Sequence, residues 1–151
     1  MSVKEKPQVE SFDLDSIDTR AACNKAIEVE LVNPATKKPL GIFWSILGND
    51  SDEAREYNRN QINADGRKAA YARKRGKDPE VKTIEILELE TIDWLTICST
   101  GWRSTDGNVI KYKGELLEFN VPNCRRVLTD KSFIRQQLSE EILDLENFMK
   151  S

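Results

Sequence analysis

The sequence predicts a mainly helical α+β fold, in which an N-terminal β-hairpin is followed by a helical bundle with a short second hairpin. Three observations carry this prediction. Residues 26–32 and 40–47 are apolar-rich segments of strand length on either side of a turn, 33–39, as in an antiparallel hairpin. Residues 84–102 place apolar side chains at helical spacing, and residues 134–149 do the same near the end of the chain.

Length and composition favour one globular domain. We expect it to span residues 12–151 of the 151-residue chain, after a flexible tail of residues 1–11. The net charge of -3 is too small to indicate a class of partner. No apolar run approaches the ~20 residues that span a bilayer, and the N-terminus lacks the apolar core of a signal peptide. We therefore expect a cytoplasmic protein with no membrane partner.

The residue types exclude several kinds of chemistry. Histidine is absent, which rules out Ser-His-Asp and Cys-His catalysis as well as imidazole metal sites. Cys23, Cys98 and Cys124 lie far apart without a Cys-x-x-Cys pair, so we interpret each as a small apolar filler of the core. Neither a Gly-x-Gly-x-x-Gly nor a phosphate-loop motif occurs. We predict that the protein is not an enzyme and has no cofactor, catalytic residue or metal ligand.

The first hairpin is expected to take part in self-association. Two strands alone are only marginally stable in water, so this hairpin must dock on helices or on another chain. Phe43 and Trp44 are adjacent and therefore lie on opposite faces of the second strand. One of them points away from the helices, and an exposed aromatic side chain on an edge strand favours pairing with a neighbour. We predict homo-oligomers that form through Phe43 and Trp44.

The helix that follows is expected to begin within 48–53 and to end near Arg75. Its apolar stripe is thin, with Tyr57 and Tyr71 as the large members, and Gly66 weakens its middle. Its end is strongly basic, with Arg67, Lys68, Arg73, Lys74, Arg75 and Lys77. The simplest interpretation of these cations is a solvated face at a helix C-terminus, and the main alternative is contact with an acidic partner helix. Nucleic acid is disfavoured, because only Tyr71 is interleaved with the cations and the net charge is negative.

The central helix is predicted to start near Pro79 and to end at Trp102, with Gly101 as its left-handed C-terminal residue. The β-branched segment 83–90 also fits a strand, but its alternation breaks while the helical period continues. Because apolar residues cover several of its faces, we expect this helix to be surrounded on much of its circumference.

The last third of the chain is predicted to hold a hairpin and two helices. Strands 109–113 and 116–119 meet at Gly114, and Asn120 caps a short helix. Thr129 or Asp130 should cap the final helix, which has the stripe Ile134, Leu138, Ile142, Leu145 and Met149 with Phe148 beside it. We expect this helix to pack on the central helix, and the alternative is that it partly contacts another chain. The predicted core comprises Trp94, Leu95, Trp102, Leu138, Ile142 and Leu145.

The order of these features resembles the tail assembly chaperones of long-tailed (siphovirus-type) bacteriophages. The resemblance covers nearly everything after residue 11, and its ordered set is more specific than any single piece. It departs from the family at the lysine-rich segment 104–112 and at the acidic approach to Trp94. The segments that carry it are FDLDSIDT (12–19), NPATKKPL (33–40), LGNDS (47–51), TGW (100–102), GELLEF (114–119) and the final Ile142-x-x-x-x-Asn147-Phe148.

The resemblance implies a factor of the infected cell that is absent from the mature virion and acts in the host cytoplasm. It would keep the long tape-measure protein soluble and help to recruit tail-tube protein until the tube polymerises. On this interpretation the basic helix contacts a helical tape-measure segment, with the cations steering the encounter and apolar groups supplying affinity. The predicted binding residues are Arg67, Lys68, Arg73, Lys74, Arg75, Tyr57 and Tyr71.

Two other functions remain compatible with the sequence. The hairpin-plus-helix pattern also fits another phage morphogenesis protein, such as a tail-tube or head-tail joining subunit. From a different class, a small nucleic-acid-binding regulator would use the cations between Arg67 and Lys77, and its binding would depend strongly on salt.

Overall fold

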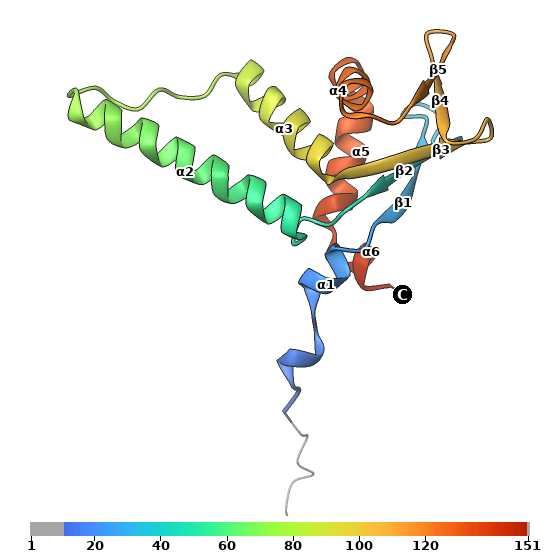
Figure 1. Ribbon diagram of the computed structural model, residues 1–151, viewed down its shortest axis with the longest axis horizontal. Coiled ribbons are helices and arrows are strands. Elements are labelled where there is room, and N and C mark those ends of the chain that lie inside the picture. The colour runs from blue at the N-terminus through green and yellow to red at the C-terminus, as the bar shows by residue number, and fades with distance from the viewer. Residues whose placement is uncertain (1–10, 151) are drawn as a thin grey trace, which may run out of the picture.

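The computed structural model describes residues 11–150, and in it the predicted α+β, mainly helical fold is confirmed (Figure 1). All but Ser11 of the predicted flexible tail, residues 1–11, lies outside the described residues. The elements in order are the 3-10 turn η1 (Leu14–Ser16), α1 (Thr19–Cys23), β1 (Ile27–Val32), β2 (Pro39–Ile46), α2 (Asp52–Lys74), α3 (Ile84–Cys98), β3 (Ser99–Ser104), β4 (Val109–Tyr112), β5 (Glu115–Glu118), α4 (Val121–Asp130), α5 (Ser132–Leu143) and α6 (Leu145–Met149).

Strands β1, β2 and β3 form one antiparallel sheet in that order. The predicted hairpin of β1 and β2 is confirmed, with Val29 opposite Trp44. Strand β3 pairs with the other edge of β2 and places Trp102 opposite Trp44. The prediction that the central helix continues through Gly101 to Trp102 is therefore wrong, because these residues belong to a strand.

Local hydrogen bonds explain why α3 stops at Cys98. Ser99 takes an extended conformation (φ -85°, ψ 131°), and its hydroxyl donates to the Leu95 carbonyl at 2.6 Å. The same hydroxyl accepts a hydrogen bond from the Trp44 indole at 2.8 Å. Pairing with β2 thus replaces the last helical turn. The spacing from Cys98 to Trp102 suits both a helix and the inner face of a strand, so it could not distinguish them.

The start of α3 also differs from the prediction. The helix begins at Ile84 with Thr83 as its N-cap, five residues after Pro79, and Thr83 accepts from the Ile86 amide at 3.3 Å. Its second half is buried through Ile92, Leu95 and Cys98, but its first half is exposed on all sides. The expectation that the helix is surrounded therefore holds only for its C-terminal half.

The core lies between the inner face of the sheet and the helices α3, α4 and α5. Trp102 contacts Trp44 and Phe119 edge to face, each with ring centroids 5.0 Å apart. Its indole N–H donates to the Leu117 carbonyl at 3.0 Å, which ties the β4–β5 hairpin to the sheet. Of the predicted core residues, Leu95, Trp102, Leu138 and Ile142 are buried, Trp94 is half-buried and Leu145 is exposed.

The final helical segment is broken, contrary to the single stripe predicted. Asp144 takes an extended conformation between α5 and α6 and caps α6 through the Glu146 amide. The break rotates α6, so that Phe148 enters the core while Leu145 and Met149 remain 43% and 42% exposed.

The predicted cap of the last helix is also wrong. Thr129 and Asp130 both lie inside α4, and Lys131 precedes α5 without a side-chain cap. Asp130 instead accepts a hydrogen bond from the Tyr112 hydroxyl, which raises the pKa of Tyr112 and lowers that of Asp130.

The second hairpin and the start of α4 are confirmed. Strands β4 and β5 pair around Lys113 and Gly114, which both have positive φ (49° and 80°) as a tight turn requires. Asn120 caps α4 through the Asn123 amide at 2.8 Å, with Pro122 in the first turn.

The three cysteines are buried and free, in agreement with their interpretation as core residues. Burial raises the pKa of Cys98 to about 12 and that of Cys124 to about 11. Both thiols are therefore protonated at neutral pH, which makes them poor nucleophiles.

Candidate partner-binding surface

A helical arm projects from the body of the molecule. It comprises the second half of α2 (residues 61–74), the connector 75–83 and the first turns of α3 (residues 84–90). Figure 1 shows α2 leaving the body as a long helix and the connector returning from its tip to α3. With 23 residues, α2 is about 35 Å long. Its start agrees with the predicted start within residues 48–53, and its end at Lys74 agrees with the predicted end near Arg75. Ser51 caps it through the Ala54 amide.

Polar contacts hold the base of the arm together. The Lys82 ammonium lies 2.7 Å from Asp65 and 2.6 Å from Glu90, and Gln61 donates to the same Glu90 carboxylate at 2.9 Å. The hydrogen bonds to Asp65 and Glu90 raise the pKa of Lys82, so the lysine stays charged. The Tyr57 hydroxyl donates to the Glu90 carbonyl at 3.0 Å. These contacts fix α2 beside α3 below the tip of the arm.

The predicted cations lie on the arm and are exposed. Six cations, between Arg67 and Lys77, belong to this group, and none of them makes an ion pair among residues 11–150. Because none of them is paired with a carboxylate among the described residues, they give the end of α2 a local positive charge. They are Arg67, Lys68, Arg73, Lys74, Arg75 and Lys77.

The two predicted tyrosines occupy different environments. Tyr57 is half-buried between α2 and α3, where burial raises its pKa. Its hydroxyl donates a hydrogen bond to the backbone carbonyl of Glu90. Tyr71 is exposed near the tip, with the Arg75 guanidinium 4.6 Å above its ring. Tyr71 is therefore accessible to a partner, whereas Tyr57 joins the two helices of the arm.

Exposed apolar side chains on the arm were not predicted as binding residues. Ile84 is 72% exposed, and Leu87 and Leu89 are about half exposed on the same short stretch of α3. The sequence pattern instead predicted that the central helix is surrounded by neighbours on much of its circumference. The informative signal was that its apolar residues lie on several helix faces, more than one neighbouring element can cover.

A cleft opens between α2 and the connector. Its volume is about 540 Å³, within the range of ligand pockets. Its apolar lining includes Tyr71, Ala72, Pro79, Val81 and Ile86. Charged residues line it as well: Lys68, Arg75 and Lys77, and the acids Asp78 and Glu80 of the connector.

The edge-strand premise behind the predicted self-association through Phe43 and Trp44 is wrong. Strand β2 lies between β1 and β3, so it has no free edge. Trp44 is fully buried, and half-buried Phe43 lies on the outer face with the Arg103 guanidinium 4.0 Å above its ring. The outer edge of β1 is partly covered too, since the Gln137 amide both donates to and accepts from the Val32 backbone.

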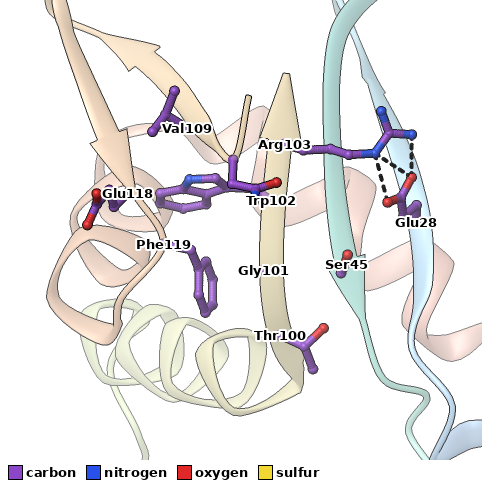
Figure 2. A pocket seen from close by; sticks show the side chains of 10 residues that line it. Glu28, Ser45, Thr100, Gly101, Trp102, Arg103, Val109, Glu118 and Phe119 are labelled. Carbon is purple, nitrogen blue, oxygen red and sulfur yellow. Dashed lines mark hydrogen bonds and ion pairs between the residues drawn. The ribbon is translucent and has the colours of Figure 1, made fainter. Parts of the chain in front are cut away.

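A second hollow of about 560 Å³ lies beside β3. In Figure 2 the Glu28–Arg103 ion pair stands on one side of β3, and Trp102 and Phe119 lie on the other. Arg103 contacts both carboxylate oxygens of Glu28, with the shortest distance at 2.6 Å. These two charges satisfy each other, which leaves the arm as the stronger candidate for binding.

The comparisons with known proteins give no relative. No protein-family model, curated protein or solved structure matches the chain. Within the part of the chain that the structure describes, no group of three His, Cys, Asp or Glu side chains could hold a metal ion. No helix in residues 11–150 combines the length and apolar character needed to cross a membrane.

Proposed function

We propose that this protein is a non-catalytic phage tail assembly chaperone that binds a helical segment of the tape-measure protein through its arm. The observation that carries the proposal is the combination of exposed apolar side chains with unpaired cations on one projecting element. The ordered sequence features that resemble this chaperone family support it. Recruitment of tail-tube protein belongs to the same proposal.

The apolar residues of α3 suit an amphipathic helix as the client. Ile84 and Leu87 are three residues apart, so they lie on one side of α3 and can pack against the apolar stripe of a partner helix. Burial of each side chain removes apolar surface from water, which is the main favourable term in such contacts. Copies bound along one long client would add their individually weak affinities through avidity.

The cations determine encounter and orientation more than affinity. Exposed charges steer a partner of opposite sign and are screened by salt within about 10 Å at 0.1 M ionic strength. Acidic residues that flank the client's apolar stripe would face the end of α2. We therefore expect removal of the cations to slow association and removal of the apolar residues to weaken the complex.

Co-expression with the tape-measure protein tests the proposal. The apolar variant Ile84→Ala/Leu87→Ala should lose client affinity by about 100-fold and recover little soluble tape-measure protein. Alanine is the strongest helix former, so α3 should remain helical in this variant. The cation variant changes Arg67, Lys68, Arg73, Lys74 and Arg75 to glutamine and should give an intermediate yield.

A matched control changes five lysines outside the arm. Lys25, Lys37, Lys38, Lys111 and Lys113 are all exposed, and their change to glutamine should leave the soluble yield as in the wild type. Equal recovery with the wild type and both arm variants would refute the role of the arm. If the wild-type chain fails to solubilise the client but binds DNA with a steep salt dependence, the chaperone proposal is wrong.

A further inference from the structure

The N-terminal segment, residues 12–18, exposes apolar and acidic side chains in alternation. Phe12, Leu14 and Ile17 are 66%, 78% and 49% exposed, and among residues 11–150 no ion pair involves Asp13, Asp15 or Asp18. Figure 1 shows the segment leaving the body beyond α1, away from both sheets. Three large apolar side chains so close together without cover mark an interaction element.

The arm cleft has the complementary character. Tyr71, Val81 and Ile86 give it an apolar lining. Of its charged lining residues, Asp65 and Glu90 are paired with Lys82 at the base of the arm, whereas Lys68 and Arg75 make no ion pair among residues 11–150. Between residues 66 and 77 the chain has six cations and no carboxylate. The connector carries Lys77 as well as Asp78 and Glu80, and these two acids would turn the carboxylates of an incoming acidic segment toward the cations of α2.

We propose that the N-terminal segment of one copy docks in the arm cleft of a neighbouring copy and so links copies head to tail. Phe12, Leu14 and Ile17 enter the cleft, while Asp13 and Asp15 face the cations of α2. Donor and acceptor surfaces differ, so the interface is heterologous, and each copy can bind one neighbour at each end. Such contacts give rings or open chains.

Chain geometry excludes the copy's own cleft as the docking site. The segment is tethered at the start of α2, where Thr19 donates a hydrogen bond to Asp50 and Arg20 lies 3.0 Å from Asp52. Along α2, Tyr71 lies about 28 Å beyond Asp52. Six residues from Asp18 back to Phe12 span at most about 21 Å, and Ile17 can move only about 4 Å from its tether. The three apolar side chains therefore cannot all reach their own cleft.

The docked segment would leave the apolar part of the proposed client surface free, while Lys68 and Arg75 belong to both surfaces. Ile86 lines the cleft, whereas Ile84 and Leu87 do not. Ile86 points about 160° away from Ile84 and about 100° away from Leu87 around α3. A neighbouring copy and a helical client can therefore bind one arm together. The inference itself does not depend on the identity of the client.

Sedimentation velocity over a wide concentration range tests the assembly with the full chain alone. The wild type should form species larger than a dimer as concentration rises, and salt should weaken them. The segment variant Phe12→Ala/Leu14→Ala/Ile17→Ala and the cleft variant Tyr71→Ala/Val81→Ala/Ile86→Ala should each self-associate at least about tenfold more weakly. A control variant, Leu116→Ala/Val121→Ala/Leu143→Ala, removes equally exposed apolar residues elsewhere and should assemble like the wild type.

Mixing the two defective variants separates head-to-tail docking from other modes. The segment variant keeps an intact cleft and the cleft variant keeps an intact segment, so their mixture should form 1:1 pairs that do not grow further. A wild type that stays monomeric at every concentration would overturn the proposal. Assembly of the segment variant at wild-type strength would overturn it too, because another part of the neighbour would then occupy the cleft.

Discussion

Replacing Trp102 with alanine is expected to lower the free energy of unfolding by about 3–5 kcal/mol. Trp102 is buried, stacks edge to face on Trp44 and Phe119, and donates to the Leu117 carbonyl. The substitution leaves a cavity between the sheet and the β4–β5 hairpin. It also leaves the Leu117 carbonyl without the hydrogen bond that the Trp102 indole donates. Such a loss is a large fraction of the stability of a typical domain, about 5–15 kcal/mol. Urea unfolding followed by circular dichroism measures it.

Two further variants test whether burial in the core determines the loss of stability. Leu138→Ala removes a fully buried side chain of α5 and should cost about 2–5 kcal/mol, whereas Leu145→Ala changes an exposed position of α6 and should cost well under that. An unfolding midpoint that is unchanged in both Trp102→Ala and Leu138→Ala would remove this core assignment. Equal losses for Leu138→Ala and Leu145→Ala would contradict the break at Asp144.

Elements with a local signal could be predicted from the sequence. Ser51 and Asn120 cap helices because a short polar side chain there satisfies a free amide, which is a property of the segment itself. The turn at Lys113 and Gly114 and the strands of the first hairpin have the same local origin. These predictions needed no knowledge of the rest of the fold.

Elements that depend on distant partners were missed. Strand β3 exists because Trp102 finds Trp44, 58 residues earlier in the chain, and its apolar spacing also fits a helix. The break at Asp144 likewise has no glycine or proline to announce it, and it brings Phe148 into the core in place of Leu145. Tertiary packing decided both cases.

The candidate site was predicted only in part, because its charges are visible in the sequence whereas the exposure of its apolar residues depends on tertiary packing. The cations of the arm could be found because charge runs are visible in the sequence, and the structure places them on an exposed helix end. The apolar residues Ile84 and Leu87 were not predicted to bind, since the central helix was expected to be surrounded on much of its circumference and a helical stripe alone does not show which of its residues contact a neighbour. Tyr57 looked available but joins α2 to α3.

Gly48→Ala is expected to destabilise the protein by about 3 kcal/mol or more, although it adds a single methyl group. A Cβ at Gly48 would lie 2.3 Å from the Cys23 sulfur, 2.7 Å from its Cβ and 3.2 Å from its Cα. Cys23 is fully buried, and the Gly48 amide donates to its carbonyl at 3.0 Å. The added methyl must therefore separate α1 from the end of β2 and stretch this hydrogen bond. Thermal and urea unfolding both measure the loss.

Two other glycines supply matched controls, because an added Cβ meets nothing within 4 Å at either Gly101 or Gly66. Gly101→Ala should change the unfolding free energy by no more than about 0.5 kcal/mol. Gly66→Ala lies inside exposed α2 and should stabilise the protein by up to about 1 kcal/mol. In a double-mutant cycle, Cys23→Ala should recover part of the Gly48→Ala loss, since it removes the sulfur contact but leaves the Cβ contact at 2.7 Å. Losses that simply add would show that the clash with Cys23 is not the cause.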